Sequence, residues 1–176
     1  MTVAWKKQSP EKAKAIYQAL KESGIDFVVT VPESWMREVA DLIQQDPDIR
    51  YVCVAREEEG VALAAGAWLG GKRPAMLMES TGLGNSLTAL GGVNLEWQIP
   101  VLILTSFRAG LGESFGFVGS FSSRFDRIVE ALGVPYFIVR DAREAEAVIK
   151  ASQAQASTQR IPVVVFLTAS AVWDEK

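Results

Sequence analysis

The sequence contains no histidine and a single cysteine among its 176 residues. Without histidine, His-based catalytic triads, histidine general bases and His-ligated metals are excluded, and one thiol cannot build a zinc site. Acid–base chemistry therefore falls to Glu, Asp, Lys, Tyr or a bound cofactor. Cys53 lies in an apolar, strand-like run, which predicts a buried free thiol in a reducing, cytoplasmic compartment.

Long apolar runs and strong net charge are also lacking. No stretch approaches the roughly eighteen apolar residues of a membrane span, and residues 1–7 lack the apolar core of a signal peptide. With 18 Lys and Arg against 21 Asp and Glu, the net charge is −3, so nothing indicates binding to nucleic acid or an anionic membrane. The 49% share of hydrophobic residues is typical of a soluble globular protein, and we expect one domain over residues 1–176.

Apolar strand-like runs alternate with helix-like segments along the chain. The predicted strands cover residues 26–31, 49–55, 75–78, 99–105, 134–139 and 161–167. The predicted helices cover residues 10–23, 33–45, 57–70, 86–96, 121–132 and 142–156. This pattern indicates a three-layer α/β/α fold with a mainly parallel six-stranded sheet. Residues 106–120 form a long predicted loop, a candidate for a lid or a substrate contact.

Three consecutive carboxylates, Glu57, Glu58 and Glu59, open the helix predicted over residues 57–70. That helix is apolar around its circumference, as a buried helix is. Because a helix turns about 100° per residue, the three side chains diverge and at most one serves a given site. A helix N-terminus favours the carboxylate whereas burial favours the neutral acid, so Glu58 is a candidate for proton exchange near neutral pH. The alternative is an acidic turn that only complements the helix dipole.

Ligands bind parallel α/β sheets at the carboxyl ends of the strands, so the segments that follow the strands should meet there. Arg108 follows one strand and could pair with a carboxylate, sulfonate or phosphonate, or remain solvated. A Gly-rich segment follows another strand and could approach a ligand closely or form a tight turn without one. Its residues are Thr81, Gly82, Leu83, Gly84 and Asn85.

The motifs REEEGVA at residues 56–62, AGAWL at 65–69 and STGLGNS at 80–86 resemble the pyrimidine-binding domain of thiamine diphosphate enzymes. Within that superfamily the chain is most similar to the alpha subunit of sulfopyruvate decarboxylase, with phosphonopyruvate decarboxylase as a close relative. Further matching pieces are VPES at residues 31–34, IPV at 99–101, Arg108 and residues 112–113. The resemblance covers residues 24–139 and implies the pyrimidine-domain fold.

The resemblance also implies roles for the candidate residues. Glu58 falls on the glutamate that hydrogen-bonds the pyrimidine nitrogen of thiamine diphosphate, which lets the cofactor deprotonate its own thiazolium carbon and decarboxylate a 2-oxo acid. The segment Thr81 to Asn85 is expected to contact the cofactor. The substrate pocket is expected to contain Pro32, Glu33, Ser34 and Arg108.

Such enzymes hold the diphosphate and its Mg²⁺ in a second domain marked by Gly-Asp-Gly, a motif that this sequence does not contain. The resemblance therefore implies a separate beta subunit carrying that domain, and a homodimer of this chain within a hetero-oligomer. The helices predicted over residues 57–70 and 86–96 are the candidate packing surfaces.

The segment 114–121 differs from the corresponding part of sulfopyruvate decarboxylases, which bears proline and methionine. The substrate therefore stays open between sulfopyruvate, an intermediate of coenzyme M biosynthesis, phosphonopyruvate and another 2-oxo acid. Two other readings also remain open, a non-catalytic scaffold subunit of the same fold and a stand-alone domain that binds a small anion.

Overall fold

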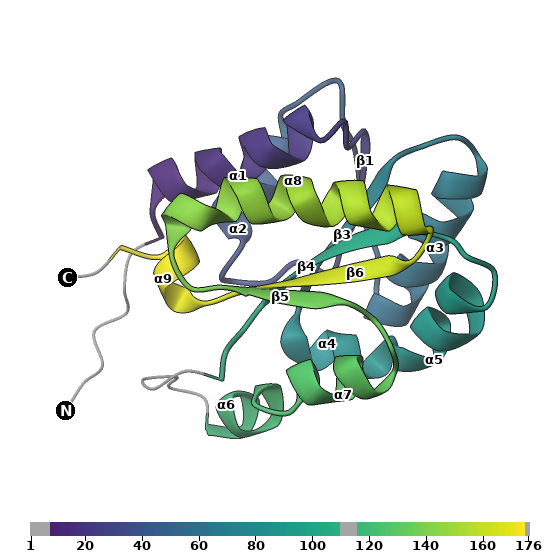
Figure 1. The fold of residues 1–176 in the computed structure, drawn as a ribbon. Coiled ribbons are helices and arrows are strands. Elements are labelled where there is room, and N and C mark those ends of the chain that lie inside the picture. The colour runs from purple at the N-terminus through teal and green to yellow at the C-terminus, as the bar shows by residue number, and fades with distance from the viewer. Residues whose placement is uncertain (1–7, 110–115, 175–176) are drawn as a thin grey trace.

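A central sheet of six parallel strands organises the computed structural model, which describes residues 8–109 and 116–174 (Figure 1). The strand order is β2-β1-β3-β4-β6-β5. The strands are β1 (Phe27–Thr30), β2 (Arg50–Cys53), β3 (Pro74–Glu79), β4 (Val101–Ser106), β5 (Tyr136–Val139) and β6 (Pro162–Leu167). The predicted parallel sheet is confirmed.

Helices cover both faces of this sheet, which gives the three layers seen in Figure 1. One face is covered by α1 (Pro10–Glu22), α2 (Arg37–Gln44), α8 (Ala142–Gln159) and α9 (Ala169–Val172). The other face is covered by α3 (Glu57–Leu69), α4 (Ser80–Asn85), α5 (Leu87–Ala89), the π-helix η1 (Leu90–Leu95), α6 (Gly116–Ser122) and α7 (Phe125–Ala131).

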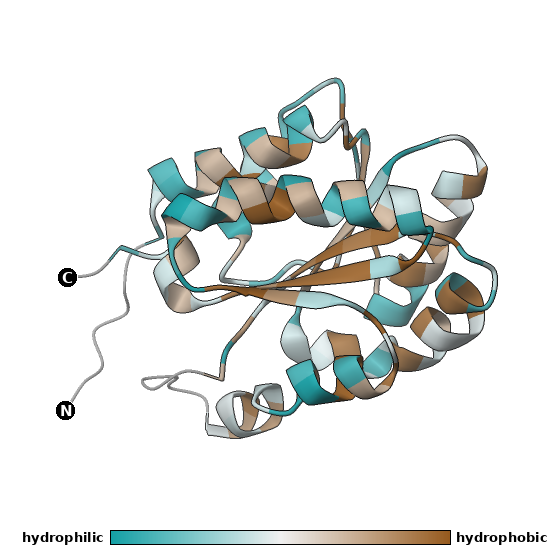
Figure 2. Ribbon diagram, in the orientation of Figure 1, coloured by the Kyte–Doolittle hydropathy of each residue, from teal (hydrophilic) through white to brown (hydrophobic). Residues whose placement is uncertain are grey.

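Two hydrophobic cores result, one on each side of the sheet. Leu102 and Leu104 of β4 pack into the core beneath α1, α2 and α8, whereas Val101 and Ile103 pack into the core on the α3 side. Every residue of β4 and β6 is buried, and most of each strand is hydrophobic (Figure 2). Burial on both faces explains why the strands lack the alternation of a half-exposed sheet.

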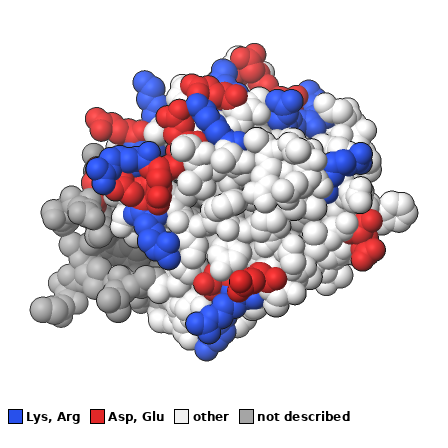
Figure 3. Space-filling model, viewed as in Figure 1, with Lys and Arg blue, Asp and Glu red and all other residues white. Residues whose placement is uncertain are grey.

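The face turned to the viewer in Figure 3 carries charges of both signs, which gather mainly over α1 and α8. Lys150 of α8, for example, pairs with Glu146 at 2.7 Å and also with Glu22 of α1. Because the two signs are interspersed, this face presents no single-sign patch. None of the described helices is long and apolar enough to cross a membrane.

Two predictions are wrong, the burial of Cys53 and the residue at which the second helix begins. Cys53 is exposed, not buried, because β2 is an edge strand whose outer residues meet solvent. The helix predicted from residue 33 begins only at Arg37, because the carboxylate of Glu33 instead accepts a hydrogen bond from the Trp35 N–H at 2.8 Å in the preceding turn. Of the predicted loop 106–120, residues 110–115 lie outside the described residues, and α6 begins at Gly116.

Asp46 ties the turn before β2 to helix α1. Its Oδ2 atom accepts a hydrogen bond from the Tyr17 hydroxyl at 2.6 Å and pairs with Nζ of Lys21 at 2.7 Å, and its Oδ1 atom accepts from the Asp48 N–H at 2.9 Å. The hydrogen bonds from Lys21 and then Tyr17 lower the pKa of Asp46 to about 2. The ionised carboxyl is thus the form that the fold stabilises.

We predict that Asp46→Asn lowers the melting temperature (Tm) at pH 7 and changes its acid dependence. The pKa of Asp46 is lower in the folded protein than the roughly 3.9 of an unfolded chain, so its stabilisation is present above pH about 4 and lost as the pH falls towards 2. Thermal unfolding between pH 7 and 2 should show a steeper loss of Tm below pH 4 in the wild type than in Asp46→Asn. The exposed Asp41→Asn variant serves as the control, and parallel curves for the wild type and Asp46→Asn would contradict the prediction.

Candidate functional site

The carboxyl ends of the strands bring the predicted site residues to one edge of the sheet. Because all strands are parallel, the segments that follow β1, β2, β3 and β4 leave the sheet on the same side. The register places Thr30 of β1 beside Leu77 of β3, and Glu79 of β3 beside Ser106 of β4. Segments far apart in the sequence therefore lie next to each other at this edge.

Glu58 is the second residue of α3, and its carboxylate is open to solvent. Its Oε1 atom lies 3.2 Å from a guanidinium nitrogen of Arg56, and 43% of its side chain is exposed. Glu57 points elsewhere and accepts a long hydrogen bond of 3.4 Å from the Asn85 amide, whereas Glu59 is exposed. The three consecutive carboxylates thus occupy three different environments, and Glu58 is less buried than the apolar helix suggested.

The Gly-rich segment predicted as a turn is the short helix α4, which follows β3 directly. A Cβ atom on Gly82 would lie 2.2 Å from Cγ of Glu57, and one on Gly84 would lie 2.8 Å from the Phe125 ring. Leu83 is fully buried in the core on the α3 side. The prediction of a turn is therefore wrong, and both glycines are explained by close packing of α4 against its neighbours.

Glu33 is held beneath the turn that follows β1. Its Oε2 atom accepts the hydrogen bond from Trp35, whereas its Oε1 atom is buried and has no hydrogen-bond partner among the described residues. The pKa of Glu33 is raised to about 7, mainly by burial and to a smaller extent by the charge of Glu79. The Trp35 and Met36 N–H groups and Arg108 act in the opposite direction and lower it. Glu33 is therefore a carboxyl group that changes its protonation near neutral pH.

Arg108 lies beside Glu33 and is only 6% exposed. Its guanidinium carbon stands 5.4 Å from the centre of the Trp35 ring, within the range of a cation–π contact. The alternative of a solvated loop arginine is therefore wrong. Pro32 and Ser34 are exposed on the same turn, and the Ser34 carbonyl accepts a hydrogen bond from the Gln8 amide.

The sequence prediction missed Glu79, which ends β3 at the same edge. Its Oε2 atom accepts a hydrogen bond from the Thr81 hydroxyl at 2.9 Å, and its Oε1 atom is buried without a partner among the described residues. The sequence contains a signal for this residue, an acidic side chain directly after the apolar run 75–78. The segment predicted to follow that strand begins at Ser80 and therefore excludes Glu79. Glu79 and Glu33 thus each have one buried carboxylate oxygen without a partner among the described residues.

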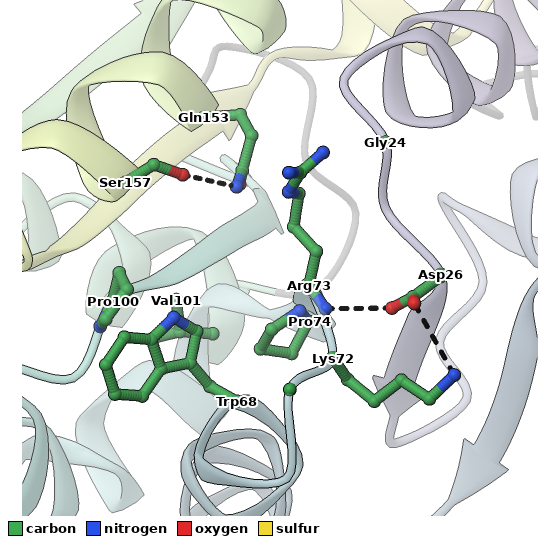
Figure 4. Close-up of a pocket in the computed structure, with 11 residues that line it drawn as sticks. Gly24, Asp26, Trp68, Lys72, Arg73, Pro74, Pro100, Val101, Gln153 and Ser157 are labelled. Carbon is green, nitrogen blue, oxygen red and sulfur yellow. Dashed lines mark hydrogen bonds and ion pairs between the residues drawn. The ribbon is translucent and has the colours of Figure 1, made fainter.

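A cavity of about 580 Å³ lies at the opposite edge of the sheet, where β3 and β4 begin (Figure 4). The Arg73 side chain extends there between Gln153 of α8 and Gly24. Asp26 accepts hydrogen bonds from the Arg73 N–H at 2.8 Å and from Lys72 at 3.5 Å. This cavity lies at the amino ends of the strands, away from Glu58, Glu33 and Arg108, so we do not place the functional site in it.

The sequence of residues 11–110 matches the family described as thiamine pyrophosphate enzyme, N-terminal TPP binding domain. The chain belongs to this family. It is 35% identical to the sulfopyruvate decarboxylase subunit alpha of Methanococcus maripaludis over 157 residues, which cover 89% of this chain and 94% of that one. The corresponding subunit of Methanocaldococcus jannaschii is 32% identical over 88% of this chain and 92% of its own length.

More distant similarities agree with this membership of the thiamine pyrophosphate enzyme family. A phosphonopyruvate decarboxylase of Streptomyces viridochromogenes is 36% identical over 90 residues, which are 51% of this chain and 23% of that protein. Among solved structures, a 2-oxoglutarate:ferredoxin oxidoreductase from Magnetococcus marinus superimposes with a TM-score of 0.70 over 92% of this chain and 29% of its own. At 16% identity, that superposition supports the fold alone.

The carboxylate of Glu58 is the described group at this edge whose chemistry suits the pyrimidine ring of thiamine pyrophosphate (thiamine diphosphate). The Glu58 carboxylate is exposed and paired only with an exposed arginine among its described neighbours, so a ring nitrogen can reach it. Across residues 8–109 and 116–174, however, no group of three His, Cys, Asp or Glu side chains could hold a metal ion.

We predict that Gly84→Ala destabilises the chain whereas Gly92→Ala does not. The new Cβ at position 84 would press on the buried Phe125 ring, and overpacking of this kind costs about 1–3 kcal/mol. Gly92 has open space around it, so alanine there only improves helix propensity. Thermal unfolding should show a Tm lowered by about 2–4 °C for each kcal/mol in Gly84→Ala. Equal Tm values for the two variants would contradict the packing described for α4.

Proposed function

We propose that this chain is the alpha subunit of a thiamine diphosphate-dependent 2-oxo acid decarboxylase, with sulfopyruvate as substrate and sulfoacetaldehyde and carbon dioxide as products. The observation that carries the proposal is the exposed carboxylate of Glu58 at the carboxyl edge, in a chain that is similar to sulfopyruvate decarboxylase alpha subunits over most of its length. A cytoplasmic location and a role in coenzyme M biosynthesis belong to the same proposal.

In this function thiamine diphosphate supplies the electron sink for loss of carbon dioxide. Glu58 hydrogen-bonds the pyrimidine nitrogen and moves a proton at that atom. Of the five α4 residues predicted to contact the cofactor, Thr81 and Asn85 reach the surface and are the ones we assign to that contact, because Leu83 is buried and both glycines serve packing.

Arg108 is proposed to bind the acidic tail of the substrate. A guanidinium buried against Trp35 keeps a fixed orientation, which suits recognition of a sulfonate or phosphonate. Pro32, Glu33 and Ser34, on the adjacent turn, complete the proposed pocket. Phosphonopyruvate is the second candidate substrate, supported by the similarity to phosphonopyruvate decarboxylases.

A beta subunit is proposed to hold the diphosphate and Mg²⁺. The outer face of α3 supports a protein partner, because Leu63 and Leu69 are 39% and 70% exposed on a helix that is apolar on all sides. Ala62 and Gly66 extend this face, and Trp97, after η1, is 74% exposed. We propose that these apolar groups are covered in the hetero-oligomer, by a second copy of this chain or by the beta subunit.

We predict that Glu58→Gln lowers decarboxylation at least about a hundredfold, because general acid–base groups contribute about 10²–10⁴ in rate. The assay measures carbon dioxide release from sulfopyruvate and from phosphonopyruvate by this chain mixed with a candidate beta subunit, thiamine diphosphate and Mg²⁺. The matched control is Glu59→Gln, which removes an exposed neighbour and should retain activity. Undiminished activity of Glu58→Gln would instead support a scaffold role for this chain.

A further inference from the structure

The cavity at the amino ends of β3 and β4 has the dimensions of a small-molecule site and takes no part in the proposed function (Figure 4). Its volume is about 580 Å³, and ligand pockets in proteins commonly measure about 300–1,000 Å³. Four segments distant in sequence surround it: the turn between α1 and β1, the end of α3 with the turn into β3, the start of β4, and α8. The lining side chains that carry polar or aromatic groups are Asp26, Trp68, Lys72, Arg73, Gln153 and Ser157.

Arg73 holds a fixed position in this cavity. Its Nη1 atom donates a hydrogen bond to the Ser23 carbonyl at 3.2 Å. Gly24, with a φ of +75°, lies directly beside this group, and a Cβ atom there would overlap Nη1 of Arg73. Figure 4 accordingly shows the Arg73 side chain extended between Gly24 and Gln153. The glycine thus leaves room for a guanidinium that is already in place before a ligand binds.

The Arg73 guanidinium has no carboxylate as a hydrogen-bond partner within residues 8–109 and 116–174. Asp26 is the one acidic residue among the described residues that line the cavity. It accepts hydrogen bonds from the Arg73 backbone N–H at 2.8 Å and from Nζ of Lys72 at 3.5 Å, not from the guanidinium. A guanidinium binds a carboxylate or phosphate through two parallel N–H···O bonds, so the cavity is suited to an anion.

Gln153 offers a second polar contact from the α8 side. It is only 7% exposed, and its Nε2 atom donates a hydrogen bond to the Ser157 hydroxyl at 3.1 Å. Its Oε1 atom is buried and accepts no hydrogen bond from the described residues. Because the Ser157 hydroxyl can accept or donate, the amide can also turn round, and one of its two polar atoms then still lacks a partner. A buried polar atom without a partner is destabilising, so a ligand that hydrogen-bonds this amide gains affinity.

An apolar wall completes the cavity. Its members are Trp68, Pro74, Pro100 and Val101 (Figure 4). The guanidinium carbon of Arg160 stands 5.1 Å from the centre of the Trp68 ring, and this cation–π contact holds the indole at the end of α3. The part of a ligand that lies against this wall is therefore apolar.

We propose that this cavity binds a small organic anion. Its carboxylate or phosphate pairs with the guanidinium of Arg73, its apolar body lies against Trp68, and a polar group hydrogen-bonds the amide of Gln153. The site is separate from the carboxyl edge, because Trp68 lies ten residues after Glu58 on α3, which corresponds to roughly 15 Å along the helix. The inference therefore does not depend on the proposed decarboxylase function.

The site is tested by NMR titration of the ¹⁵N-labelled full chain, followed at the indole N–H signals of the tryptophans. The probes are para-aminobenzoate, which carries a carboxylate, and adenosine monophosphate, which carries a phosphate. Adenosine is the matched compound without the anion. We expect at least one of the two anions to shift the Trp68 signal in a saturable way and to bind at least about tenfold more tightly than adenosine. The anion that binds more tightly identifies carboxylate or phosphate as the group recognised.

Arg73→Gln removes the charge and should weaken binding of that anion at least about tenfold. The variant should keep its fold, because Asp26 is bonded to the backbone N–H at position 73. Arg127→Gln, at an exposed arginine of α7, is the matched control and should bind like the wild type. Wild-type affinity in Arg73→Gln would overturn the proposal, as would the absence of any shift with both anions. Shifts at Trp35 without a shift at Trp68 would place the anion at Arg108 and would overturn it as well.

Discussion

The parallel direction of all six strands determines where this protein can place its chemistry. Every strand ends at the same edge, so Glu33, Glu58 and Arg108, which follow β1, β2 and β4, lie at that edge together with Glu79, the last residue of β3. The two buried cores fix the strands and hence this edge. The site is thus a consequence of topology, and the individual side chains then decide what it does.

At that edge the acidic groups are arranged by degree of burial. Glu58 is exposed beside Arg56, whereas Glu33 and Glu79 each have a buried oxygen to which none of the described residues donates a hydrogen bond. Burial favours proton binding at Glu33, whereas the positive charge of Arg108 favours its ionised form. An exposed carboxylate and two carboxyl groups with buried oxygens therefore lie at the same edge of the sheet. The outer face of α3 carries a second notable feature, the exposed apolar side chains of Leu63 and Leu69.

The sequence predicted the alternation of strands and helices well. A strand buried on both faces, such as β4, is visible in the sequence as a mostly apolar run, without any knowledge of distant contacts. It failed where the outcome depends on distant contacts. Strand order cannot be read from the runs themselves, so Cys53 was assigned to the interior although β2 lies at an edge. The glycines of α4 suggested a turn, whereas the reasons for them are Glu57 and the Phe125 ring, 25 and 41 residues away in sequence. Glu79 was missed because the burial of its Oε1 atom without a hydrogen-bond donor among the described residues arises only when the chain folds.

The central claim is that the cofactor site is divided between this chain and a partner. The most direct test is calorimetric titration of thiamine diphosphate, with Mg²⁺ present, into this chain, into a beta subunit carrying Gly-Asp-Gly, and into their mixture. The account predicts tight, stoichiometric binding in the mixture and weak binding to this chain alone, because we propose that the beta subunit holds the diphosphate and Mg²⁺. Tight binding of the cofactor by this chain without a partner would contradict it.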